Sequence, residues 1–175
     1  MTFPVFASGD VLLASDMNAV GMWLVKTQTI GTGVTSVTVT NAFSSTYDNY
    51  RVIVSGGASS AADAGLTLTL GAKVTGYKSV LYYQDYTGSA ITILGSVTTY
   101  MHSGRTGTNG HSAVMDFVAP NLAKNTTMIA HGSSPTYNVW AINNTNDTTQ
   151  YTDFTLDRSA GTLTGGTIKV YGYRN

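Results

Sequence analysis

The strongest constraint on the fold is an alternation of apolar and hydroxyl side chains with a period of two. The clearest instance is Leu66–Leu70, which reads Leu-Thr-Leu-Thr-Leu, and Val37–Thr40 repeats the pattern. Successive side chains of a β-strand point to opposite faces, so this alternation predicts strands with one buried and one solvated face. Thr and Ser together supply 44 of the 175 residues. That share favours strands, because the branched Thr side chain fits a pleated surface.

Short runs of this kind recur along the chain between turn sequences rich in Gly, Asn and Ser. No helical pattern of ten or more residues falls between them, so the sequence predicts an all-β chain that folds as an antiparallel, jelly-roll-like β-sandwich. Of the candidate ranges, we expect about eight to ten to form strands. The candidates are 22–30, 34–40, 50–55, 66–70, 77–83, 90–95, 97–101, 112–118, 126–131, 137–142, 151–157 and 166–173.

The first 21 residues do not share the alternation. Ser15 or Asp16 can cap a short helix that begins near Met17, and Gly21 limits it to about two turns. We therefore divide the chain into an N-terminal docking segment, 1–21, and a β-sandwich domain, 22–175. A strap that closes one end of the sandwich is the alternative role for this segment. Its candidate docking residues are Phe6, Val11, Leu12, Leu13, Met17 and Val20.

Charge is sparse and balanced, with nine Lys and Arg against nine Asp and no Glu. Zero net charge gives no basic surface for nucleic acid, and no apolar run is long enough for a membrane span. The first residues lack the pattern of a signal peptide, and the absence of Cys excludes disulfides and thiolate metal sites. Few surface charges protect poorly against association, so we expect a chain built to assemble.

Catalytic and metal-binding patterns are weak. His102 and His111 flank a glycine-rich stretch and could meet Asp116 at a metal, but the spacing fixes no geometry, and histidines making ordinary hydrogen bonds are the favoured interpretation. A glycosidase would need two converging carboxylates, and we expect Asp153 and Asp157 to lie on a solvated strand face instead. No cofactor, metal or catalytic residue is therefore predicted.

Two features suggest a binding surface. Tyr residues gather in the middle of the chain, and Tyr82 and Tyr83 are neighbours on one predicted strand, so one of them must face outward or lie against a neighbour. The segment Gly104–Gly110 lacks a phosphate-binding Lys and is predicted to be an exposed, mobile loop. Core or interface packing is favoured for the aromatic residues over a glycan platform. The candidate receptor or interface residues are Tyr82, Tyr83, Tyr86, Arg105 and Asn109.

Three stretches resemble virion proteins of tailed bacteriophages. Phe6-Ala-Ser-Gly-Asp-Val-Leu-Leu-Ala-Ser-Asp-Met-Asn18 is similar to the N-terminal segment of small tail-fibre and minor tail proteins. Gly161–Arg174 is similar to the closing strand of small β-sandwich virion proteins, and Phe43–Val54 also resembles that group. These stretches cover about a quarter of the chain and carry structural motifs only.

The resemblance implies a structural subunit made in the cytoplasm of the host bacterium and assembled into the virion, without enzymatic activity. It implies other virion proteins as partners and a homo-oligomer, with a trimer favoured. The expected role is a tail-fibre or baseplate-associated subunit that displays a surface for a host glycan or protein. The alternatives are a capsid decoration or head-fibre protein and, from another class, a small polysaccharide-cleaving enzyme.

Overall fold

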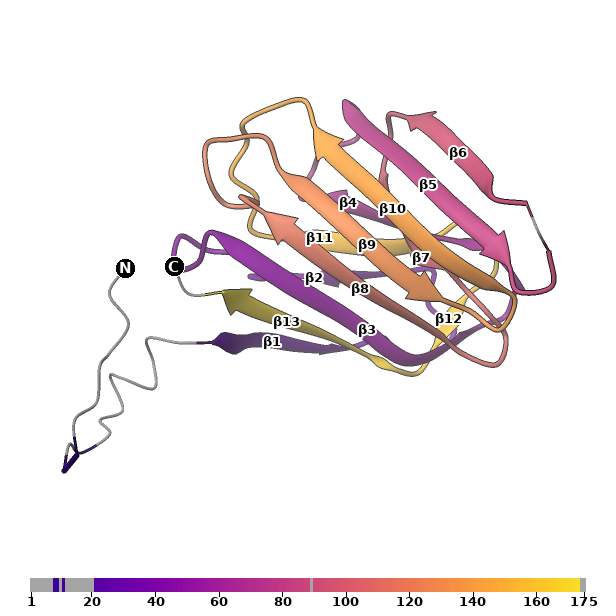
Figure 1. Ribbon diagram of the computed structural model, residues 1–175, viewed down its shortest axis with the longest axis horizontal. Helices are drawn as coiled ribbons and strands as arrows, with labels where there is room; N and C mark the ends of the chain where they lie inside the picture. Colours follow the sequence, from indigo (N-terminus) through magenta and orange to yellow (C-terminus); the bar gives the residue numbers. More distant parts are fainter. Residues whose placement is uncertain (1–7, 10, 12–20, 89, 174–175) are drawn as a thin grey trace.

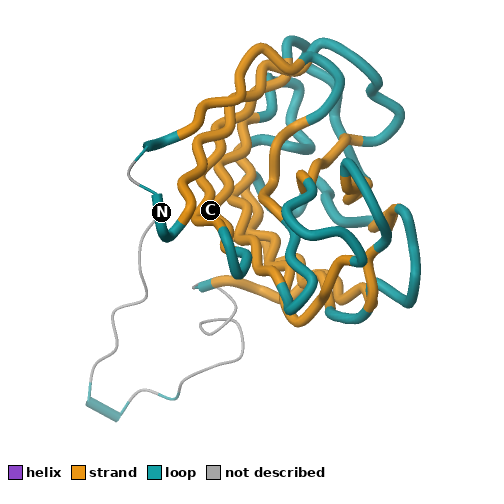
Figure 2. Tube along the Cα trace, turned by 90° about the vertical axis from the view of Figure 1, so that its right-hand side faces the viewer, coloured by secondary structure: helices purple, strands orange, loops and turns teal. Residues whose placement is uncertain are grey.

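The computed structural model describes residues 8–9, 11, 21–88 and 90–173, and its strands form two antiparallel sheets (Figure 1). In spatial order, the large sheet contains β1 (Met22–Thr29), β13 (Thr167–Tyr173), β3 (Asn49–Ser59), β8 (His111–Val118), β9 (Thr127–Ser133), β10 (Tyr137–Thr145), β5 (Tyr77–Asp85) and β6 (Thr92–Val97), and β12 (Leu163–Thr164) pairs with β3. The small sheet contains β2 (Ser36–Val39), β11 (Phe154–Arg158), β4 (Gly65–Leu70) and β7 (Met101–Arg105). The two layers lie side by side in Figure 2. The predicted all-β sandwich is confirmed.

Eight of these strands pair as a jelly roll. The first strand β1 pairs with the last strand β13, β2 with β11, β3 with β8, and β4 with β7. Contacts of β13 with β3 and of β11 with β4 complete the two four-stranded sheets. This nesting of first with last and second with second-last is the pattern of two Greek keys wound into one sandwich.

Four further strands widen only the large sheet. β5 and β6 are inserted between β4 and β7, and β9 and β10 between β8 and β11. They continue the large sheet beyond β8 in the order β9, β10, β5 and β6. The large sheet therefore extends past the small one on this side, which leaves a broad outer surface over β8 to β6.

The core lies between the sheets and follows the alternation seen in the sequence. Leu66, Leu68 and Leu70 of β4 are fully buried. At one end of the core, the ring of Phe43 lies 5.0 Å from that of Tyr50 and 5.7 Å from that of Phe154. The fold satisfies the one polar atom in this cluster, because the Tyr50 hydroxyl donates to the carbonyl of Ser44 over 2.8 Å.

All but one of the predicted strand ranges coincide with a strand. The exception is 97–101: residues 98–100 connect β6 to β7, and β7 lies at Met101–Arg105. The prediction missed β7 because its sequence, Met-His-Ser-Gly-Arg, does not alternate between apolar and polar residues. Four of the five residues of β7 are nevertheless buried between the sheets. The two-residue strand β12 was also not predicted.

The predicted helix and most candidate docking residues lie outside the described residues. These are Phe6, Leu12, Leu13, Met17 and Val20. Val11 is described, and its side chain is 77% exposed. The first described strand, β1, begins at Met22.

Candidate functional site

The outer face of the large sheet carries large apolar side chains that face solvent. Strand register aligns Ile93 of β6, Tyr82 of β5, Trp140 of β10 and His131 of β9 in one row across the sheet. Ile93 is 60% exposed and Trp140 50%. A contiguous surface of this kind on a soluble protein usually marks a site of interaction.

Trp140 is held in a fixed orientation within this row. Its indole stacks on the imidazole of His131, with ring centroids 5.5 Å apart and planes inclined by 19°. Ile142, two residues further along β10, is also exposed and pairs with Ile129 of β9. Because the row sits on paired strands, its side chains form a rigid surface.

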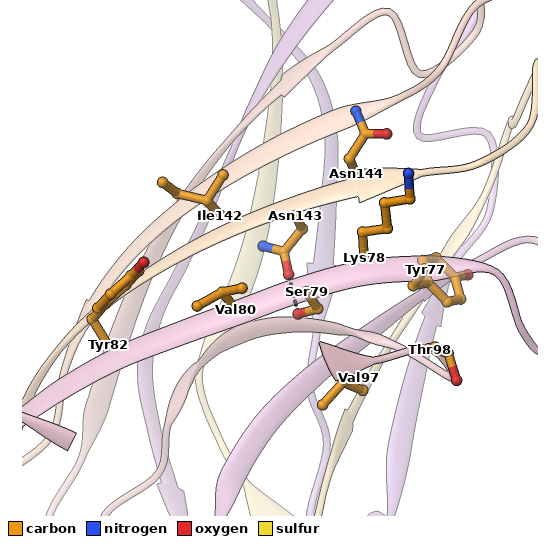
Figure 3. A pocket seen from close by; sticks show the side chains of 10 residues that line it. All are labelled: Tyr77, Lys78, Ser79, Val80, Tyr82, Val97, Thr98, Ile142, Asn143 and Asn144. Atoms are coloured by element: carbon orange, nitrogen blue, oxygen red, sulfur yellow. Dashed lines mark hydrogen bonds between the residues drawn. The ribbon is translucent and has the colours of Figure 1, made fainter. Parts of the chain in front are cut away.

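A groove of about 630 Å³ opens beside this row, along β5 (Figure 3). Its volume is within the range of sites that bind small molecules. We call it the β5 groove. It is lined by Tyr77, Lys78, Ser79, Val80, Tyr82, Val97, Thr98, Ile142, Asn143 and Asn144.

An irregularity in strand pairing creates the groove. β5 and β6 pair at Ser79 with Val97 and at Leu81 with Leu94, so β6 carries an extra residue opposite Val80. Such a bulge bends a strand and interrupts its hydrogen bonds. Gly95 lies in the bulge, and a Cβ atom placed there would come within 3.9 Å of Val80 Cγ2. Because Gly95 has no side chain, it leaves the groove open beside Val80.

Strand alternation and register supply the side chains of the groove. Lys78, Val80 and Tyr82 occupy alternate positions of β5 and therefore share its outer face. On the neighbouring strand β10, Asn144 pairs with Lys78 and Ile142 with Val80. Figure 3 shows Lys78 and Asn144 together near one end and Tyr82 at the other, with Val80 and Ile142 between them.

A buried hydrogen-bond network fixes the strands beneath the groove. The Ser79 hydroxyl donates to Asn143 Oδ1, and both oxygens accept the backbone N–H of His102 at 2.9 Å. Asn143 Nδ2 donates to the carbonyls of His102 and Met128 over 3.0 and 3.2 Å. These bonds join β5 and β10 of the large sheet to β7 of the small sheet, so the floor of the groove cannot move without breaking them.

Lys78 alone carries a charge among the lining residues. Within the described part of the chain, the three ion pairs are Arg51–Asp116, Lys73–Asp147 and Arg158–Asp157. The Lys78 ammonium belongs to none of them. The groove therefore combines an aliphatic floor, an aromatic ring, an amide and one cation available to a ligand.

The candidate surface residues divide into two groups. Tyr82, Tyr86 and Asn109 are exposed, whereas Tyr83 and Arg105 are half-buried. The Arg105 guanidinium lies against the rings of Tyr83 and Tyr137, 4.5 and 4.6 Å from their centroids, and the two rings pack edge to face 5.1 Å apart. Alternation explains the difference for the tyrosines, because neighbours on β5 face opposite sides of the sheet. Arg105 and Tyr83 pack against each other and are therefore only partly exposed.

The segment Gly104–Gly110 was expected to be an exposed loop, and this is wrong for most of it. Gly104 and Arg105 belong to β7, and Thr106 is fully buried and donates its N–H to the carbonyl of Ala64 over 2.8 Å. Thr108 and Asn109 form the exposed turn. The glycines permit close packing here: a Cβ on Gly107 would meet Pro135 Cδ at 2.3 Å.

The expectation of ordinary hydrogen bonds for His102 and His111 is also wrong. Both imidazoles are buried, and among the described residues none of their ring nitrogens has a hydrogen-bond partner. Burial lowers the pKa of His102 to about 4, with a further contribution from the charge of Arg105, and burial also lowers the pKa of His111. Both rings are neutral at pH 7.

The aspartates proposed for metal or sugar chemistry are engaged elsewhere. Asp116 accepts two bonds from Arg51, at 2.7 and 2.8 Å, and the hydrogen bond with Arg51 is the main reason that its pKa is lowered. Asp153 accepts the N–H of Asn41 over 2.8 Å, and Asp157 pairs with Arg158. Within the described ranges, no group of three or more metal-binding side chains is gathered at one place.

Three turns, those that contain Tyr86, Asn109 and Thr136, gather at the end of the sandwich opposite to the start of β1. Pairing of Asp85 with Tyr137 brings the end of β5 to the turn between β9 and β10, and Tyr86 N–H donates to the carbonyl of Thr136 over 3.1 Å. Gly107 brings the β7–β8 turn to the same place. In Figure 1 these turns lie at the right, whereas β1 begins at the left.

Comparisons with known proteins identify no relative. No family model matches the sequence, and no curated protein matches it either. Among solved structures, the crystal structure of the infectious bursal disease virus VP2 subviral particle shows 10% identity and a TM-score of 0.17, over 88% of this chain and 42% of that one. The structure of the Gx strain of infectious bursal disease virus gives 13% identity and a TM-score of 0.18, over 90% and 39%. The chain spans about two fifths of these proteins, and such low scores carry no argument about fold or function.

The sequence alone could identify only some of the residues that line the groove. Lys78, Val80 and Tyr82 could be assigned to one face from the alternation along 77–83, but only Tyr82 was singled out. Ile142 and Asn144 could not be found, because their position beside β5 depends on a register between segments about 60 residues apart. Nothing in the sequence near Trp140 indicates that its side chain faces solvent. The described residues include no helix long and apolar enough to cross a membrane.

Proposed function

We propose that this protein is a structural subunit of a tailed-bacteriophage virion, made in the host cytoplasm, and that it acts in a tail fibre or baseplate. The observation that carries the proposal is the exposed apolar and aromatic surface over β9, β10, β5 and β6, next to the β5 groove. A jelly roll with such a surface is suited to assembly and to presentation of a binding face. We propose a phage in particular because Phe6–Asn18 and Gly161–Arg174 resemble segments of phage virion proteins.

The positions of the start of β1 and of three exposed turns support separate roles for the two ends of the sandwich. β1 begins at one end of the sandwich, and the turns around Tyr86, Asn109 and Thr136 lie at the opposite end. A subunit attached through its first residues would therefore direct these turns outward. Under this proposal the N-terminal segment contacts other virion proteins, and the domain forms a homotrimer.

A capsid decoration or head-fibre protein remains the alternative, because it would need the same docking segment and the same sandwich. The polysaccharide-cleaving enzyme is disfavoured by the engagement of Asp116 with Arg51 and of Asp157 with Arg158. We expect Asp116→Asn, Asp153→Asn and Asp157→Asn to leave the biological role unchanged apart from stability. Loss of activity on a defined glycan with folding intact would favour the enzyme instead.

Location in the particle tests the proposal directly. Gold-labelled antibody against the purified domain, applied to phage particles that encode this chain, should mark the tail tip or baseplate in electron micrographs. Label over the head would favour the decoration protein. Absence of the chain from purified particles, measured by mass spectrometry, would refute a virion role.

A further inference from the structure

The β5 groove has the two-sided chemistry of a sugar site. Its floor is formed by the aliphatic side chains of Val80 and Ile142, and its rim by the amide of Asn144, the hydroxyl of Thr98 and the phenol of Tyr82. A sugar ring likewise presents C–H groups on its faces and hydroxyls on its edge. Tyrosine suits this contact because it joins a large apolar ring to a polar end.

The charge in the groove restricts the ligand further. The Lys78 ammonium has no carboxylate partner among the described residues, and it shares its end of the groove with Asn144, Tyr77 and Thr98, none of which carries a charge (Figure 3). A cation without a carboxylate partner favours a ligand that carries a negative charge, because opposite charges across an interface are complementary. The Asn144 amide is oriented by its bond to Thr127 Oγ1 at 2.9 Å.

The dimensions and rigidity of the groove also suit an oligosaccharide. Lys78 and Tyr82 are four residues apart on one strand, a rise of about 13 Å. The Ser79–Asn143 network beneath holds β5 and β10 in place, so binding costs little ordering of the protein. A short saccharide can therefore contact Tyr82 with one ring while a second unit reaches Lys78.

We propose that the β5 groove binds a carboxylate-bearing saccharide, with the Tyr82 ring against a sugar face, Lys78 paired with the carboxylate and Asn144 hydrogen-bonded to a hydroxyl. The inference rests on the proposed function, because it names the ligand class of the display surface. A second copy of this chain is the competing occupant. It would cover the apolar row but would leave Lys78 without a carboxylate unless an Asp of the partner reached it.

An array of printed oligosaccharides tests the proposal with the full-length chain. The array carries uronic-acid and sialic-acid oligosaccharides together with their carboxyl-reduced counterparts. The chain should bind acidic members and not the reduced ones, and binding should weaken as salt is raised, because an exposed ion pair is screened. Binding of no acidic member, or equal binding of the reduced forms, would overturn the proposal.

Paired variants locate the site. Lys78→Gln and Tyr82→Ala should each weaken binding by about tenfold or more, since each removes one of the two main contacts. Lys169→Gln and Tyr171→Ala, both on β13, remove the same residue types from outside the groove and should bind as the unaltered chain does. All four side chains point outward, so an unchanged melting temperature verifies folding. Equal affinity of Lys78→Gln and the unaltered chain would refute the assignment.

Two further measurements separate this inference from its premise. Light scattering of Tyr82→Ala shows whether the groove is a subunit contact: dissociation of the oligomer would overturn the saccharide assignment in favour of a second copy. Incorporation of Lys78→Gln into particles tests the premise alone. If Lys78→Gln is incorporated normally but no longer binds the saccharide, both proposals are supported. If the unaltered chain binds the saccharide but is absent from particles, the virion role is refuted and the groove assignment is still supported.

Discussion

Acid should destabilise this protein well above the pH at which carboxylates titrate. The cause is His102, whose imidazole is 4% exposed and has no hydrogen-bond partner on either ring nitrogen among the described residues. Burial and the charge of Arg105 lower its pKa from 6.5 to about 4. In the unfolded chain the same ring is in water and takes up a proton near pH 6.5.

The sign follows from proton linkage. Between pH 6.5 and pH 4 the unfolded state holds a proton that the folded state does not, so the free energy of unfolding falls as the pH falls. The slope is about 1.4 kcal/mol per pH unit for one such group. Between pH 7 and pH 5, His102 should therefore remove about 2 kcal/mol. The pKa of His111 is lowered too, and this group adds to the loss in the same direction.

Urea titrations at pH 7, 6 and 5 measure this loss. With a typical dependence of about 2 kcal/mol per molar urea, the midpoint should fall by about 1 M between pH 7 and pH 5. His102→Leu should lose most of that pH dependence, because its side chain does not titrate. His131→Leu removes an exposed imidazole and serves as the matched control, which should keep the full dependence. A midpoint that does not change with pH, or an NMR titration of His102 near pH 6.5, would refute the reasoning.

Four further outcomes are expected. Arg105→Ala should lower the free energy of unfolding by about 1–2 kcal/mol, since it removes the cation that packs against the rings of Tyr83 and Tyr137. Arg105→Lys should recover part of the loss, and equal stability of all three chains in urea would contradict this contribution of the cation. Asn143→Ala should cost about 2–3 kcal/mol by thermal or urea unfolding, because it leaves buried backbone groups of β7 without partners. Deletion of residues 1–19 should preserve most of the melting temperature and abolish incorporation into particles, whereas a loss of several kcal/mol would assign the segment to the core. Light scattering should give the mass of a trimer, and a stable monomer at tens of micromolar would contradict this.

The alternation in the sequence was sufficient to predict the class of fold, because a strand with one buried face has an apolar residue at every second position of its own sequence. Leu66–Leu70 shows this most simply: its three leucines are fully buried in the small sheet. β7 shows the limit. His102 and Ser103 are buried without an apolar pattern, because they lie where the two sheets are joined by hydrogen bonds to Asn143.

The candidate site was less predictable than the fold, because a site on a sheet face depends on which strands are neighbours. Tyr82 could be singled out as an aromatic residue with an outward position. That Asn144 would lie beside Lys78 follows only from the pairing of β10 with β5, and the groove itself follows from the bulge opposite Val80. Similarly, the position of Arg105 beside an exposed turn gave no sign that its guanidinium packs against two tyrosine rings.

The pairing of β1 with β13 has a consequence for synthesis. β13 lies between β1 and β3, so both strands lack a neighbour until the segment up to Tyr173 has left the ribosome. A nascent chain therefore exposes open strand edges for most of its translation, and closure of the sheet requires pairing between the first and the last of the described strands. Non-local closure of this kind makes folding slow and leaves partly folded chains prone to edge-to-edge association. Chains truncated before Thr167 should accordingly collect in aggregates and not as soluble partial domains.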